Sequence, residues 1–153
     1  FEQTPKDRFW NVYYNHANEP VHFVPYLFNQ LDAPWLTQYW TRFICANAYK
    51  NQVEGLCGNE DVGQMSAWYV LSAAGIHQAC PGDTRFEITS PVFDEAVFTG
   101  TGFTVRAHNQ SKENVYIQRM ELDGKPYDKT WIDYKDITAG RTLDIYLGPQ
   151  PKK

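Results

Sequence analysis

The sequence predicts an α+β protein, with helices in its first half and antiparallel strands in its second half. Apolar residues recur at spacings of three and four before residue 75, and they occur in short alternating runs after residue 83. With 153 residues, of which 42% are hydrophobic, the chain is long enough for one ordinary domain or two small ones. We expect a helical region over residues 1–80 and a strand region over residues 81–153.

Three helices are expected in the first region. Those over Pro20–Leu31 and Pro34–Lys50 each begin with a proline, which suits the first helical turn. The third is expected over Gln64–Ala74, and Gly75 supplies its end. Because Gln64–Ala74 is apolar or small nearly all round, we expect it to be buried on every side.

The strand region is expected to contain short strands separated by glycine-containing turns. Alternation of apolar and polar residues between such turns is typical of antiparallel strands. The expected strands are Phe86–Thr89, Ala96–Phe98, Phe103–Ala107, Val115–Ile117 and Leu143–Leu147.

Charge and composition exclude several classes of partner. The chain has 14 basic and 18 acidic residues, so no basic face predicts binding to nucleic acid or anionic lipid. No apolar run reaches the roughly 18 residues of a membrane span, so no span is expected. The three cysteines predict one disulfide bond or none. Residues 1–8 show neither an initiator methionine nor a targeting segment, as expected of an internal cut from a longer protein.

Aromatic residues make up 16% of the sequence, and wide flat side chains are what sugar rings stack against. Trp10, Trp35, Tyr39 and Trp40 flank the two segments described next. We expect most of them in the core and some lining a sugar subsite.

The segment over residues 57–69 carries the strongest chemical pattern. Glu60 and Asp61 lie between glycines, directly before an expected helix, where helix amides and the positive end of the helix dipole face outward. One interpretation is that Asp61 or Asn59 only caps this helix. The other is a functional site, because adjacent acids beside a buried helix are costly unless they are satisfied or used.

A second candidate segment spans residues 16–26. If a helix starts at Pro20, then Asn18 and Glu19 lie at its edge and His22 lies one turn in, so Glu19 and His22 can reach the same space. A hydroxylated ligand or a hard cation would suit this arrangement. The alternatives are a capped helix with a partly buried histidine, and a zinc site that includes His16, whose spacing is not the usual His-Glu-x-x-His.

At these two segments the sequence resembles the exo-α-mannosidases of glycoside hydrolase family 92. Residues 58–69 (GNEDVGQMSAWY) are similar to the signature of that family, and Asn18-Glu19-Pro20 with His22 is similar to its upstream companion. Residues 90–94 and 147–149 resemble the C-terminal strands of the family. The resemblance covers essentially the whole chain. It implies the last helices of an (α/α) toroid followed by strands of a sandwich, with the remainder supplied by a parent enzyme.

The resemblance implies an inverting, calcium-dependent α-mannosidase that acts on terminal α-mannosides of glycans. Inversion needs a general acid and a separated carboxylate base, about 6.5 to 9.5 Å apart, with a water between them. The resemblance places the base on Asp61, and Asn59 where some members carry a second acid. It implies that Glu19 binds calcium, since oxygen ligands suit this ion. The groups expected to hold the sugar are Asn18, Glu19, His22, Glu60 and Gln64.

The general acid of the family should lie upstream of both segments. No segment between Phe1 and His16 matches it, and Glu2 is the only glutamate there. We therefore expect the isolated chain to be inactive, and the parent enzyme to be secreted, periplasmic or at the cell surface, as its glycan-degrading role implies. The rival interpretation is a non-catalytic carbohydrate-binding module, in which the acidic cluster is only a helix cap.

Overall fold

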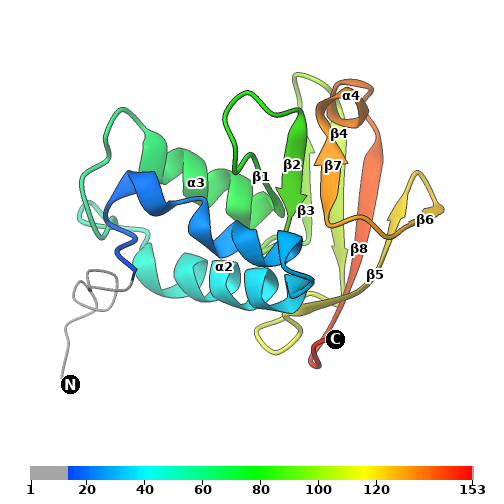
Figure 1. Cartoon of the computed structure of the whole chain (residues 1–153), viewed down its shortest axis with the longest axis horizontal. Coiled ribbons are helices and arrows are strands. Elements are labelled where there is room, and N and C mark those ends of the chain that lie inside the picture. Colours follow the sequence, from blue (N-terminus) through cyan, green and yellow to red (C-terminus); the bar gives the residue numbers. More distant parts are fainter. Residues whose placement is uncertain (1–13, 153) are drawn as a thin grey trace.

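The computed structural model describes residues 14–152, and it confirms the α+β class, with a helical layer beside strands (Figure 1). The 3₁₀ helices are η1 (Glu19–Val21) and η2 (Val24–Gln30), and the α-helices are α2 (Pro34–Ala48), α3 (Gln64–Ala74) and α4 (Tyr134–Thr138). The strands are β1 (Ile76–His77), β2 (Arg85–Ile88), β3 (Glu95–Phe98), β4 (Phe103–His108), β5 (Tyr116–Leu122), β6 (Lys125–Tyr127), β7 (Trp131–Asp133) and β8 (Thr142–Gly148).

The expected helix over Pro20–Leu31 is wrong as a single element. The structure has the two 3₁₀ helices η1 and η2 there, with a break at His22 and Phe23. Pro25 helps to explain the break, because it has no amide hydrogen to donate to the preceding turn of a continuous helix. Each 3₁₀ helix has a proline as its second residue.

Helix α3 has the predicted bounds, and Gly75 ends it with φ 97°. Its predicted burial on every side is wrong. Met65 and Trp68 are fully buried, whereas Ala67 is exposed and Val70 is 58% exposed. Small and apolar residues around a helix therefore did not place both faces in the core.

The strands form two sheets, with the orders β1-β2-β7 and β3-β4-β8-β5-β6. The pairs are antiparallel except β4 with β8, which is parallel, with Val105 opposite Leu143. The prediction of antiparallel strands is wrong for this pair. The intervening β5, β6, β7 and α4 give the chain enough length to return in the same direction.

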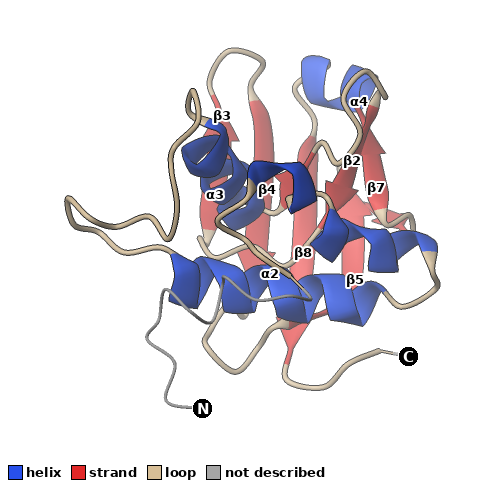
Figure 2. Ribbon diagram, turned by 60° about the vertical axis from the view of Figure 1, so that its left-hand side comes forward, coloured by secondary structure: helices blue, strands red, loops and turns tan. Residues whose placement is uncertain are grey.

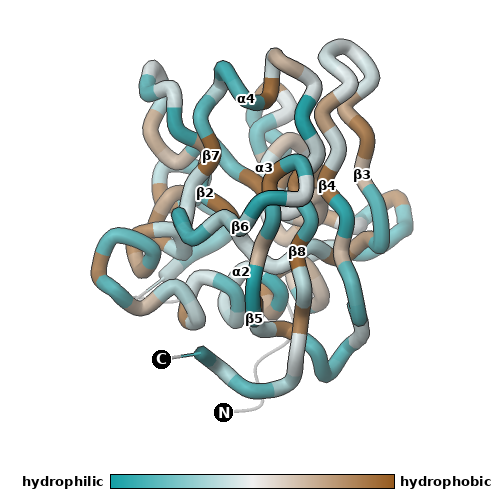
Figure 3. The backbone as a smooth tube through the Cα atoms, turned by 90° about the vertical axis from the view of Figure 1, so that its right-hand side faces the viewer, coloured by the Kyte–Doolittle hydropathy of each residue, from teal (hydrophilic) through white to brown (hydrophobic). Residues whose placement is uncertain are grey.

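The two sheets enclose one apolar core, and the helices enclose another. Figure 3 shows hydrophobic segments along β2, β7, β4 and β3. The core between the sheets contains Ile76, Ile88, Phe103, Val105, Leu122, Ile132, Ile137, Leu143, Ile145 and Leu147. The helical core contains Ala17, Tyr26, Ile44, Cys45, Ala48, Cys57, Met65 and Trp68. The division of the chain at residue 80 stays a prediction.

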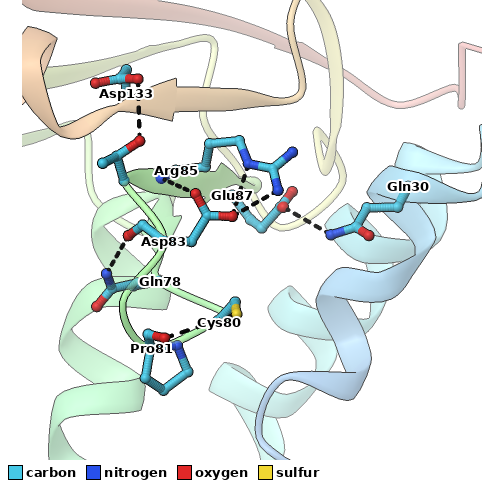
Figure 4. Close-up of polar contacts among 9 residues, drawn as sticks. Gln30, Gln78, Cys80, Pro81, Asp83, Arg85, Glu87 and Asp133 are labelled. Atoms are coloured by element: carbon cyan, nitrogen blue, oxygen red, sulfur yellow. Dashed lines mark hydrogen bonds and ion pairs between the residues drawn. The ribbon is translucent and has the colours of Figure 1, made fainter.

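The helical layer lies against the sheets (Figure 2), and polar contacts join the two. The Asn29 amide donates to Glu87 Oε2 over 2.8 Å. The Gln30 amide donates to Glu87 Oε1 over 3.4 Å, as Figure 4 shows. Arg42 in α2 donates to the backbone oxygens of Pro91 and Ser111. These contacts fix α2 and η2 against the strand region.

Within residues 14–152, no helix is both long and apolar enough to cross a membrane. Cys45, Cys57 and Cys80 all fall in the described part of the chain and form no disulfide bond with one another.

Candidate functional site

A left-handed turn carries Asp61 at the start of α3. Asp61, Val62 and Gly63 have φ values of 41°, 62° and 88°. A β-branched residue such as Val62 disfavours this conformation, and such strain concentrates at functional sites. Asp61 and Val62 are both exposed, and no donor among residues 14–152 reaches the Asp61 carboxylate. The turn therefore presents a solvated carboxylate beside the helix end.

Glu60, rather than Asp61 or Asn59, caps α3. Its Oε1 accepts from the Ser66 amide over 2.9 Å, and its Oε2 accepts from the Ser66 hydroxyl over 2.7 Å. These two bonds lower the pKa of Glu60, with the Ser66 amide contributing most. The interpretation that Asp61 or Asn59 is only a helix cap is therefore wrong. Asn59 is exposed beside this cap.

The second segment holds two buried polar atoms without a partner. Among the described residues, neither Glu19 Oε1 nor His22 Nδ1 has a hydrogen bond. His22 Nε2 lies 2.9 Å from the His16 backbone oxygen. Burial lowers the pKa of His22, and it outweighs the opposing effects of that hydrogen bond and of the nearby Glu19 carboxylate. Asn18 is exposed at the edge of this segment.

The two candidate segments touch although they are far apart in the sequence. A Cβ added at Gly58 would lie 2.7 Å from both the Cβ and the backbone oxygen of Ala17. Trp68 in α3 is fully buried, and its Nε1 donates to the His22 backbone oxygen over 2.9 Å. These two contacts, Gly58 with Ala17 and Trp68 with His22, form one framework that carries both the Asp61 turn and the Glu19 segment. Gln64 is exposed on the first turn of α3.

A buried aromatic cluster supports this framework. Both ring nitrogens of His16 lie 2.8 Å from tyrosine hydroxyls, those of Tyr14 and Tyr49. The His16 ring also stacks on His22 and meets Trp68 edge-on, with centroid distances of 4.5 and 4.4 Å. Hydrogen bonds therefore occupy both nitrogens that zinc would need. Over residues 14–152, no three His, Cys, Asp or Glu side chains gather as a metal cluster, so the zinc interpretation is not supported.

A cavity of about 630 Å³ lies next to the Glu60 cap. Its lining includes Gly58, Cys57 and Glu60 together with Asn47 and Lys50. This volume is in the range of small-molecule pockets, which run from about 300 to 1,000 Å³.

A model of the glycosyl hydrolase family 92 catalytic domain matches residues 1–149. The chain belongs to glycosyl hydrolase family 92. The predicted resemblance to this family is thereby confirmed.

Solved structures and a curated relative agree with the family assignment. A family GH92 α-mannosidase of Bacteroides thetaiotaomicron is 37% identical, with a TM-score of 0.87 over 91% of this chain and 19% of its own. An inverting family GH92 mannosidase of the same organism is 33% identical, with a TM-score of 0.82 over 90% of this chain and 19% of its own. A relative from Arthroderma benhamiae, described as an uncharacterized secreted glycosidase, is 32% identical over 88% of this chain. This chain spans 18% of that protein.

The residues that hold the two family 92 segments together are not evident from the sequence alone. Gly58 was treated as part of a motif, yet its missing side chain allows close contact with Ala17. Trp68 was expected in the core, but its hydrogen bond to the His22 backbone links positions 46 residues apart. The glycine itself was the one available signal for the first contact, because a residue without a side chain permits close approach of another backbone.

Substituting Gly58 with alanine should destabilise this family 92 chain by roughly 1–3 kcal/mol, as overpacking does. The new Cβ would meet Ala17 backbone and Cβ atoms that cannot rotate away. Chemical denaturation followed by circular dichroism measures the loss. Gly100→Ala is the matched control, because open space surrounds Gly100 and its stability should not change. Equal stability of both variants would show that the contact with Ala17 is not tight.

Acidification should weaken the fold through its buried histidines. Burial lowers the pKa of His16 to about 3 and that of His77 to about 4, from 6.5. The unfolded chain takes up these protons below pH 6.5 and the folded chain does not, so the free energy of unfolding falls as the pH falls. The expected loss is on the order of 1 kcal/mol per pH unit and per histidine.

Urea unfolding between pH 7 and pH 5 tests this effect, because carboxylates titrate mainly below that range. The His77→Phe chain should show a shallower pH dependence than the unchanged chain. Identical slopes for the two chains would contradict the assignment to His77.

Proposed function

We propose that this chain is the base-bearing part of an exo-acting, inverting, calcium-dependent α-mannosidase that hydrolyses terminal α-mannosides of glycans. The supporting observation is the Asp61 carboxylate, which is exposed, accepts no hydrogen bond within residues 14–152, and lies on the same framework as the Glu19 segment. Two solved relatives described as mannosidases support the choice of substrate class.

In this proposal, Asp61 takes the proton from the attacking water. A carboxylate within reach of that water can accept the proton as a general base. Asn59, exposed two residues earlier, orients the water through its side-chain amide. Glu60 fixes the turn through its cap on Ser66 and borders the 630 Å³ cavity, while Gln64 contacts the sugar.

Glu19 fits a calcium ligand in one respect: its buried Oε1 lacks a donor, and a hard cation would satisfy it. Calcium takes six to eight oxygen ligands, and residues 14–152 contain no cluster of three metal-binding side chains. The remaining ligands would be backbone oxygens, sugar hydroxyls or groups outside the described residues. Calcium bound there would supply positive charge to hold the mannose hydroxyls. Asn18 and His22 would hold the sugar beside Glu19.

The general acid and the rest of the active site belong, in this proposal, to the remainder of the parent enzyme. Glu2 lies outside the described residues. Residues 1–80 would form the last helices of the toroid. Residues 81–153 would form the C-terminal strands of the sandwich that follows it. The parent would be secreted, periplasmic or at the cell surface, as supported by the relative described as a secreted glycosidase.

Proton NMR of an α-mannoside during hydrolysis tests the proposal. The full-length parent with calcium should release β-mannose first, and a chelator should stop release until calcium is restored. The isolated 153-residue chain should release none, because the acid is missing. First release as α-mannose would exclude inversion, and turnover unaffected by chelation would exclude calcium.

A further inference from the structure

A second cavity lies far from the Asp61 turn in the fold. It has a volume of about 560 Å³ and lies between the start of α2, the β5–β6 hairpin and the C-terminal residues. Figure 1 shows the right-hand end of α2 beside β5. None of the residues that line this cavity belongs to the segments over 16–26 or 57–69. It is therefore separate from the proposed catalytic site.

Two aromatic side chains line this cavity from different layers. Trp35 comes from the first turn of α2 and Tyr127 from β6, and both are half-buried. The Tyr127 hydroxyl donates to the Trp131 backbone oxygen over 2.7 Å. Because that hydroxyl is already bonded, Tyr127 offers the cavity mainly the body of its ring. Half-buried rings provide flat apolar area with little loss of side-chain entropy on binding.

The charged groups of the cavity balance, and its cations are already engaged. Arg119 lies 3.3 Å from the centroid of the Tyr146 ring, and Lys152 Nζ donates to the Gln118 backbone oxygen over 3.2 Å. The carboxylates of Asp32 and Asp128 accept no hydrogen bond within residues 14–152. The cavity therefore offers unused acceptors but no unused cation for an anion.

Free acceptors beside flat apolar walls match one class of small molecule. A neutral ligand with many hydroxyl donors can bond the carboxylates and lay its carbon–hydrogen face on the rings. The volume fits a ligand of two or three sugar rings, since small-molecule sites span about 300 to 1,000 Å³. We propose that this cavity is a second, non-catalytic saccharide-binding site, which holds a neutral oligosaccharide apart from the site of hydrolysis.

Calorimetric titration of the 153-residue chain with neutral trisaccharides, mannotriose and maltotriose, tests this site. Trp35→Ala should weaken binding of the preferred trisaccharide by about tenfold or more, equivalent to about 1.4 kcal/mol. Asp128→Ala, at an exposed position, should weaken it several-fold. The matched control is Trp40→Ala, because Trp40 lies in the same helix, is 41% exposed and does not line the cavity. Thermal unfolding checks that each variant is folded.

Glu19→Gln distinguishes this cavity from the proposed catalytic site. The substitution should leave the affinity of the cavity for the trisaccharide unchanged. A Trp35→Ala chain that binds as the unchanged chain does would overturn the proposal, as would equal losses in Trp35→Ala and Trp40→Ala. So would the absence of trisaccharide binding up to about 10 mM, or preferential binding of a cationic diamine to the two carboxylates. Loss of binding in Glu19→Gln alone would assign the sugar to the catalytic site.

Discussion

Asp61→Asn in the full-length parent enzyme should lower kcat by on the order of 10²–10⁴-fold, the usual contribution of a general base. The amide keeps the shape of the carboxylate but cannot accept the proton of the attacking water. The Asp61 side chain is exposed and bonds to nothing among residues 14–152, so the fold should not change. Steady-state kinetics on an aryl α-mannoside and a thermal unfolding curve measure both effects.

The matched control is Asp94→Asn, since Asp94 is an exposed aspartate in the strand region, away from both candidate segments. It should leave kcat unchanged. If Asp61→Asn retained full turnover, Asp61 would not be the base. If the parent had no turnover and both variants bound glycan equally well, the non-catalytic carbohydrate-binding module would be the better description.

Trp68→Ala should cost roughly 3–5 kcal/mol of unfolding free energy, as removal of a buried tryptophan does. Trp68 is fully buried in the helical core, and its Nε1 donates a hydrogen bond to the His22 backbone oxygen. Loss of both contacts leaves a cavity and an unpaired carbonyl, and it releases the Glu19 segment from α3. Denaturant unfolding of the 153-residue chain gives the value directly.

Trp68→Phe separates packing from hydrogen bonding. It retains much of the ring volume and should cost less than the alanine substitution, including about 1 kcal/mol for the lost bond. Trp40→Ala, which truncates a tryptophan that is 41% exposed, is the control and should cost much less. Similar losses in Trp68→Ala and Trp40→Ala would mean that Trp68 does not organise the helical core.

Local signals in the sequence predicted the helices where start and stop residues were unambiguous. Helix α3 ends at Gly75 as expected, because a left-handed glycine is a local property of the chain. Pro25 was present in the sequence, but the apolar spacing around it suggested one continuous helix. Strands of two or three residues, such as Ile76–His77, were missed because alternation cannot be read over so short a run. The parallel partner of β4 depends on contacts far along the chain.

The sequence suggested a candidate site, but it did not predict the contacts within that site. The acidic motif drew attention to the turn before α3, but the sequence did not indicate that Glu60 would bind Ser66 and that Asp61 would be exposed. A valine with positive φ is not predictable from propensity, because its intrinsic preference is the opposite. The hydrogen bond between the His16 and Tyr49 side chains joins residues 33 positions apart, so no local sequence pattern predicts it.

The order of the five-stranded sheet has a consequence for how the chain folds during synthesis. β8 lies between β4 and β5, so the strand of this sheet that follows the other four in the sequence occupies the middle of the sheet. Until residues 142–148 emerge from the ribosome, the β3–β4 and β5–β6 hairpins have open inner edges that can pair with other chains. The sheet is complete only when β8 pairs with β4 and β5, which precede it by many residues. Such pairing of segments far apart in the sequence is slow. A nascent chain stalled before Thr142 should therefore be the species most prone to aggregate.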